Sequence, residues 1–183
     1  MTSVCDRTIE EVHELVGRYV YDKYHGRDRT VVKVKDMEGQ DPGPFPLYSD
    51  VGNRIGYRYS EPDILMIRDG EVKTVIEIDS IHLKPEAYVG KAIMPVISRK
   101  MVRGDDEVPI ADDVRVVQLV CYHGKPGDHE HEMELRLRQI SEDISMLFRN
   151  TGRGCTYSLV IPVRRSDDTV EKVLSRYLDD KIW

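Results

Sequence analysis

The chain has 183 residues, of which 40% are hydrophobic and 33% are charged, and its net charge is −6 at pH 7. This length predicts a single domain, residues 1–183, that buries a hydrophobic core without cross-links. The apolar share argues against a disordered chain. No run is long enough to span a membrane, and the N-terminus lacks the apolar stretch of a signal peptide. We therefore expect a soluble cytoplasmic protein with no membrane partner.

The three cysteines are Cys5, Cys121 and Cys155. Their number is odd and no pair has the spacing of a metal site, so they are interpreted as reduced thiols. Cys121 and Cys155 lie in apolar runs and are expected in the core.

The first part of the chain alternates between a helix and extended segments. Apolar residues at helical spacing predict a helix from about Thr8 to His25. The stretch from Thr30 to Lys35 is typical of a strand, and the proline- and glycine-rich stretch from Glu38 to Pro46 is typical of a loop.

A β-hairpin is predicted in the middle of the chain. Asp63 to Arg68 and Lys73 to Asp79 are both rich in β-branched and aliphatic residues, and Asp69-Gly70 stands between them. An Asp-Gly pair between two such runs favours a tight two-residue turn. The two runs should therefore be antiparallel neighbours.

The second half contains helices and buried strands in alternation. Pro85 is expected to open a helix, because proline is favoured at the first helical position. The remaining predicted elements are a buried strand from Val114 to Cys121, a helix from about His129 to Phe148, a strand from Thr156 to Val163 and a helix from Val170 to Leu178. This order predicts an α/β fold with a mixed central β-sheet flanked by helices.

Three carboxylates are expected to meet at one end of the hairpin. Because side chains alternate along a strand, Glu77 and Asp79 should face the same side. Asp63 begins the partner strand, roughly opposite them. Acids on an apolar central strand are costly unless they are paired or bound to a metal. Mg²⁺ prefers such oxygen ligands and supports phosphodiester hydrolysis. The alternative is a salt-bridged pair at the sheet edge, with Asp79 capping the next helix.

Glu61-Pro62-Asp63 followed by Glu77-Ile78-Asp79 resembles the motif of the PD-(D/E)xK nuclease superfamily, which includes restriction endonucleases and archaeal Holliday-junction resolvases. The resemblance covers about Glu61 to Cys121 and implies a restriction-endonuclease-like core. It also implies Mg²⁺ or Mn²⁺ as cofactor, held by Asp63, Glu77 and the backbone carbonyl of Ile78.

The third motif position, normally lysine, is Asp79 here. Some restriction enzymes carry an acid at this position and still cleave, whereas in others a lysine from the following helix takes the role. Lys84 and Lys91 are the candidates, and Lys84 is preferred because it lies closer to the strand. A third alternative is a site that binds metal or DNA without cutting.

Other residues are candidates for supporting roles. Many members of the superfamily add a glutamate from the first helix, for which Glu10, Glu11 and Glu14 are available. Basic residues near the motif are candidates for nucleic-acid contacts, and ordinary surface charge explains them equally well; they are Arg54, Arg58, Arg99 and Lys100. The His129–Glu132 run is interpreted as a solvated helix start, because it lacks the spacing of a zinc site.

The predicted function is a metal-dependent endonuclease, a magnesium deoxyribonuclease with Asp63, Glu77, Asp79 and Lys84 as catalytic residues and DNA as substrate. Dimerisation is a further hypothesis. The first rival is an inactive relative that serves as a nucleic-acid-binding or assembly subunit, which the acidic net charge and the missing motif lysine favour. The second is a binding domain in which the acids are structural.

Overall fold

The computed structural model describes residues 8–37, 43–49, 58–121, 127–162 and 170–182. Its elements are α1 (Ile9–Tyr24), the short 3-10 helix η2 (Arg27–Arg29), β1 (Val31–Val34), β2 (Leu47–Tyr48), β3 (Arg58–Ser60), β4 (Ile64–Arg68), β5 (Glu71–Ser80), α2 (Pro85–Ile97), β6 (Lys100–Arg103), β7 (Asp106–Cys121), α3 (Asp128–Asn150), β8 (Thr156–Val160) and α4 (Val170–Ile182).

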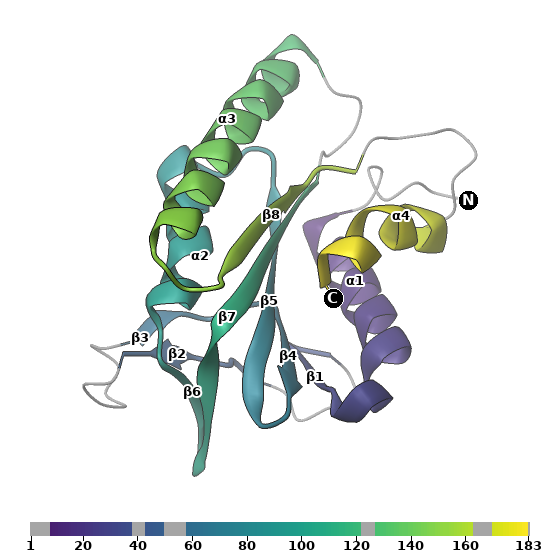
Figure 1. Ribbon diagram of the computed structural model, residues 1–183. Helices are drawn as coiled ribbons and strands as arrows, with labels where there is room; N and C mark the ends of the chain where they lie inside the picture. Colours follow the sequence, from purple (N-terminus) through teal and green to yellow (C-terminus); the bar gives the residue numbers. More distant parts are fainter. Residues whose placement is uncertain (1–7, 38–42, 50–57, 122–126, 163–169, 183) are drawn as a thin grey trace.

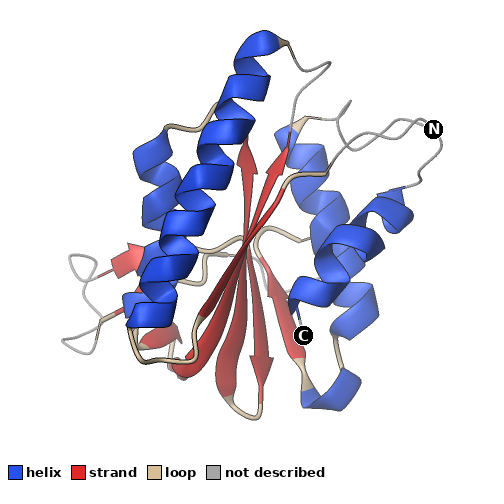
Figure 2. Ribbon diagram, turned by 45° about the horizontal axis from the view of Figure 1, so that its top comes forward, coloured by secondary structure: helices blue, strands red, loops and turns tan. Residues whose placement is uncertain are grey.

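The described strands form one mixed sheet between two layers of helices. Its order is β1-β4-β5-β7-β6-β2-β3, and β8 pairs with β7. β5 is antiparallel to β4 and parallel to β7. Figures 1 and 2 show α1 and α4 together beside one face of the sheet, with α2 and α3 beside the other. The prediction of an α/β fold with a mixed sheet flanked by helices is confirmed.

The hydrophobic core is divided by the central sheet. Along β5, Ile76 and Ile78 pack in the cluster that contains the buried residues of α1 and α4. Val75, between them and the hairpin turn, packs in the cluster that contains Ala92 and Val96 of α2. Because side chains alternate, Glu77 and Asp79 should share the α2 side of the strand with Val75.

The predicted hairpin is confirmed together with its turn. Asp69 and Gly70 both have positive φ, 54° and 81°, as a tight turn of the Asp-Gly kind requires. Ile64 pairs with Ile76, so Asp63 comes just beyond the end of β4, at the level of Glu77. β5 continues to Ser80 and thus extends past its antiparallel neighbour.

The predicted helices and the strands that the periodicity indicated are present, with shifted ends. The Thr8 hydroxyl accepts a hydrogen bond from the backbone of Glu11, and the Glu11 carboxylate accepts one from the backbone of Thr8, which fixes the start of α1. Pro85 is the first residue of α2, as expected. Cys121 and Cys155 are buried free thiols, as predicted, and Cys5 lies outside the described residues.

The short strands β2, β3 and β6, and the first part of β7, were not predicted. β6 pairs with β7 from Lys100 opposite Pro109 to Arg103 opposite Asp106. β2 joins β6, and β3 joins β2. β7 is therefore one strand of 16 residues that links this small extension to the buried centre of the sheet. β6 and β7 are joined by the two-residue turn Gly104-Asp105, which is a local signal, whereas β2 is held in the sheet by its pairing with the distant β6.

Candidate active site

The free edge of β5 is covered by two side chains at the point where β4 ends. The backbone N–H of Ile78 donates to Oδ2 of Asp63 at 2.8 Å. The carbonyl oxygen of Ile78 lies 3.1 Å from Nε2 of His13, which projects from α1. Nδ1 of the same ring is 3.6 Å from Oδ1 of Asp63. Asp63 and His13 thus satisfy the backbone groups that β4 leaves unpaired.

Glu77 is a buried acid with few groups to compensate its charge. Its exposed fraction is 1%. Burial raises the pKa of Glu77 to about 8; the charge of Lys91 opposes this rise, while the charges of Asp63 and Asp79 add to it. Such a carboxyl ionises at neutral pH only when more positive charge is brought near. A strongly raised pKa in a buried acid is typical of functional sites.

Lys91 is the amine that reaches the carboxylates. Its Nζ lies 2.6 Å from Oδ1 of Asp79 and 3.2 Å from Oε2 of Glu77. This shared contact confirms that Glu77 and Asp79 face the same side of β5. Burial alone would lower the pKa of Lys91, but the charges of Glu77 and Asp79 raise it well above its ordinary value. Lys91 therefore remains a cation throughout the neutral range.

A buried hydrogen-bond relay fixes Asp79 from the other side. Nε2 of Gln118, on β7, donates to Oδ2 of Asp79 at 2.7 Å. The Tyr157 hydroxyl, on β8, donates to Oε1 of Gln118 at 2.8 Å. Burial raises the pKa of Tyr157 well above its usual range, and the charge of Asp79 adds to this, so the phenol keeps its proton. Both oxygens of Asp79 are thus bound by protein groups, one by Gln118 and one by Lys91.

These contacts decide between the alternatives for Asp79 and for the lysine. Asp79 does not cap α2, because the N-cap residue is Lys84 and no side-chain hydrogen bond caps that end. The preference for Lys84 over Lys91 is not supported by the geometry. Lys84 sits at the helix end, whereas Lys91, two turns further along, contacts Glu77 and Asp79.

The donor set allows a limited metal site. Within the described residues, no group of three or more histidine, cysteine, aspartate or glutamate side chains could hold a metal ion. The charges of Asp63 and Glu77 interact with each other. The Ile78 carbonyl and the Asp63 carboxylate both contact the His13 ring, one at each ring nitrogen. Two carboxylates and a carbonyl suit Mg²⁺, which keeps several of its waters. In this structure His13 contacts that carbonyl and Lys91 contacts Glu77, so both side chains would have to move before the three groups could hold an ion.

A cavity of about 510 Å³ adjoins this edge of the sheet, between α1 and the end of β1. Asp63 and His13 line it, together with Glu10 and Glu14 from the first helix. Glu14 is ion-paired with Arg18 at 2.7 Å. Glu11 does not line it and instead belongs to the cap of α1. The α1 side chain that contacts the motif is His13, not one of the three glutamates.

Among the described residues, the predicted nucleic-acid contacts are engaged with other protein groups. Arg58 is ion-paired with Glu61, and Lys100 lies 3.0 Å from Glu107. Arg99 follows α2 and donates its backbone N–H to the carbonyl of Tyr48. Arg54 lies outside the described residues. The His129–Glu132 run opens α3, as predicted for a solvated helix start, and the Glu130 carboxylate accepts a hydrogen bond from the backbone of Gly127.

Three contributors were missed from the sequence: His13, Gln118 and Tyr157. Gln118 is fully buried in the apolar run of β7, so a lone amide within such a run could have been noticed. His13 lies one helical turn after Ile9 and beside the apolar stripe of α1. Tyr157 carries no comparable signal in the sequence.

No family model, curated protein or solved structure matches this chain. Among the described helices, none is long and apolar enough to cross a membrane.

Proposed function

We propose that the protein is a metal-dependent nuclease that hydrolyses phosphodiester bonds in DNA, built on a restriction-endonuclease-like core. One observation carries the proposal: the Glu77 carboxyl, 1% exposed at the open end of the β-hairpin, lies beside Asp63 and shares the Lys91 amine with Asp79, and burial raises its pKa. Its ionised form needs a further cation, and hard oxygen donors from both strands of the hairpin lie next to it. Pro62-Asp63 directly precedes β4 and Glu77-Ile78-Asp79 lies on β5, in the order that the superfamily resemblance requires.

Each residue has a role in this proposal. Asp63, Glu77 and the Ile78 carbonyl would hold Mg²⁺ or Mn²⁺, which acts as a Lewis acid and lowers the pKa of a bound water. Lys91 carries the charge that the motif lysine carries elsewhere and donates hydrogen bonds to a non-bridging oxygen of the attacked phosphate. Gln118 and Tyr157 orient Asp79, which in turn positions Lys91. Water attacks phosphorus, the P–O bond to the leaving oxygen breaks, and that oxygen takes a proton.

The experiment is cleavage of supercoiled, linear and branched DNA with Mg²⁺ or Mn²⁺. Asp63→Ala and Glu77→Ala should abolish cutting, and Glu132→Ala, which removes an exposed acid of α3, should not. Thermal unfolding of each variant separates a lost site from a lost fold. If a folded wild type does not cut any of these substrates with either metal, the nuclease proposal fails.

A matched pair of variants on one helix tests the assignment of the lysine. Lys91→Met should lose cleavage, and Lys84→Met should retain it, because only Lys91 contacts Glu77 and Asp79. Equal activity in the two variants would remove Lys91 from the mechanism. Loss in Lys84→Met alone would restore the residue that the sequence favoured.

A second candidate is an inactive nucleic-acid-binding or assembly subunit. In the structure, His13 contacts the Ile78 carbonyl, and Lys91 contacts the carboxylates of Glu77 and Asp79. The oxygens that would bind a metal ion are thus already bound by the protein's own groups, which favours this candidate. In this case the protein binds labelled DNA with an affinity that does not depend on Mg²⁺ and cuts none of the substrates. Light scattering addresses dimerisation, and a single species at monomer mass would count against it.

A further inference from the structure

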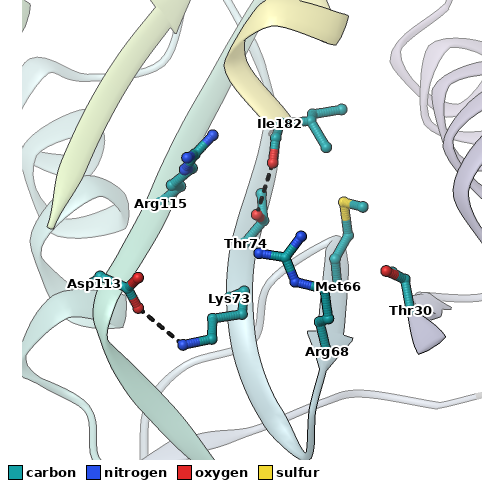
Figure 3. A pocket seen from close by; sticks show the side chains of 8 residues that line it. All are labelled: Thr30, Met66, Arg68, Lys73, Thr74, Asp113, Arg115 and Ile182. Atoms are coloured by element: carbon teal, nitrogen blue, oxygen red, sulfur yellow. Dashed lines mark hydrogen bonds and ion pairs between the residues drawn. The ribbon is translucent and has the colours of Figure 1, made fainter. Parts of the chain in front are cut away.

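A small cavity lies at the opposite end of the hairpin from the carboxylates, where the last turn of α4 meets the sheet (Figure 3). Its volume is about 40 Å³. The lining residues come from β4, β5, β7, the end of α4 and the residue before β1; they are Thr30, Met66, Arg68, Lys73, Thr74, Asp113, Arg115 and Ile182. Within the described part of the chain, none of these residues contacts the carboxylates of the candidate active site.

The charge of the lining is positive. Lys73 is compensated by Asp113 at 3.0 Å and by Glu71 at 2.8 Å. The two guanidinium groups, of Arg68 and Arg115, stand on strands β4 and β7 on either side of β5, and Figure 3 shows the Arg68 group next to Thr74. Within the described residues, the Arg115 side chain makes no hydrogen bond or ion pair, although its charge interacts with that of Asp113. Three basic side chains and one acidic side chain, Asp113, therefore line the cavity.

A buried hydroxyl in the same wall has an unmet hydrogen bond. Thr30 is 2% exposed, and its Oγ1 has no hydrogen-bond partner. Native proteins satisfy nearly all buried polar atoms, so an exception at the wall of a cavity indicates a missing partner. Figure 3 shows this hydroxyl on the side of Met66 and Arg68.

We propose that this cavity binds a phosphate group. Arginine presents several donors in a planar fork that matches the oxygens of a phosphate, and the Thr30 hydroxyl supplies a further donor. The cavity volume corresponds to roughly three water molecules at about 15 Å³ each, which admits one tetrahedral oxyanion. The carbonyl of Ile182, at the negative end of α4, opposes an anion, but Thr74 already donates a hydrogen bond to it at 3.2 Å.

The first test is titration with inorganic phosphate at constant ionic strength, with chloride as the reference salt and thermal unfolding as the measurement. Phosphate should raise the unfolding temperature of the wild type in a saturable manner, because it binds only the folded state. Arg115→Gln should lose this rise, and the control Arg136→Gln, an exposed arginine of α3, should keep it. An equal response to phosphate in wild type and Arg115→Gln would overturn the proposal.

Thr30→Val separates binding from stability. The valine has the shape of threonine without the unpaired hydroxyl, so the variant should be as stable as wild type without phosphate. Its phosphate affinity should fall about tenfold, the value of one charge-assisted hydrogen bond. An unchanged affinity in a folded Thr30→Val protein would remove Thr30 from the site.

The source of the phosphate is decided by a DNA arm. Weaker binding of a short labelled duplex by Arg115→Gln, together with the lost phosphate response, assigns the cavity to a nucleic-acid backbone. Unchanged DNA binding with a lost phosphate response assigns it to a free phosphate. The phosphate proposal does not depend on the nuclease proposal. A lost phosphate response in Arg115→Gln supports the phosphate site whether or not the variant cleaves DNA.

Discussion

Two carboxylates of this protein sit in hydrogen-bonded networks of opposite character. Asp179, on α4, accepts hydrogen bonds from Lys23, Tyr19, Tyr24 and Ser175. Burial alone would raise the pKa of Asp179, but these donors outweigh burial and lower it. The side chain is 23% exposed, so solvent helps as well.

Glu77 lies at the other extreme. It is almost wholly buried, it has one cationic partner, and two further acids lie near it, so its pKa is raised to about 8. The Asp179 network has more donors than its single charge requires and ties α1 to α4. Around Glu77 the balance is reversed, because several carboxylates share few hydrogen-bond donors. Surplus buried acid destabilises the fold, and its presence is understandable where a cation or a reaction makes use of it.

The largest expected effect distinguishes the two networks by activity. If the nuclease proposal holds, Asp63→Asn should lower metal-dependent cleavage by more than the roughly 10–100-fold that loss of a metal's outer-shell partner costs. Asp179→Asn should leave cleavage unchanged, because the partners of Asp179 among the described residues lie on α1 and α4. Initial rates on supercoiled DNA at saturating Mg²⁺ measure both. Equal losses of cleavage in the two folded variants would contradict the assignment of Asp63, but not Asp179, to the active site.

The second effect concerns stability against pH at Glu77. In the folded protein the pKa of Glu77 is about 8, so it holds its proton up to about that pH, whereas the unfolded chain releases the proton near the ordinary glutamate pKa of 4.5. The folded state thus binds more protons between these values, and the stability contributed by this group falls as pH rises through that window, by at most about 5 kcal/mol. Glu77→Gln should remove this part of the slope, as measured by urea unfolding from pH 5 to pH 9. An identical slope in both proteins would show that Glu77 does not carry it.

Asp179 should show the opposite dependence. Its pKa is lowered in the folded state, so its contribution is fully present above the pKa of an unfolded aspartate and is lost as pH falls through the folded pKa. Asp179→Asn should cost about 2 kcal/mol at pH 7 and much less in acid. Urea unfolding at pH 7 and pH 3 measures the difference. A cost that is the same at both values would mean that shape, not charge, matters at this position.

The smallest effect tests the relay behind Asp79. Tyr157→Phe removes the hydroxyl that donates to Gln118 and should cost about 1 kcal/mol of stability. If Gln118 positions Asp79 and Lys91, the variant should also lower kcat with little change in KM, which a merely structural hydroxyl would not do. Phe148 makes an edge contact with the Tyr157 ring, and this packing is retained in the variant.

The class of fold, the main helices and the central hairpin could be predicted from the sequence. Periodicity and the Asp69-Gly70 turn are local properties, and they place Asp63 opposite Glu77 once the hairpin forms. The side on which Glu77 and Asp79 lie follows from alternation along β5. These features could be predicted because each depends on residues that are close in the sequence.

The groups that meet the carboxylates come from elements that lie far apart in the sequence and could not be predicted from it. His13 comes from α1, 65 residues before Ile78, and Gln118 comes from β7, 39 residues after Asp79. Lys91 prevails over Lys84 because of the position and orientation of α2 over the sheet, which spacing along one helix does not determine. The small cavity below the last turn of α4 is likewise lined by residues from β4, β7 and the end of α4. Such contacts depend on how layers pack in space, and a local pattern in the sequence carries no information about that packing.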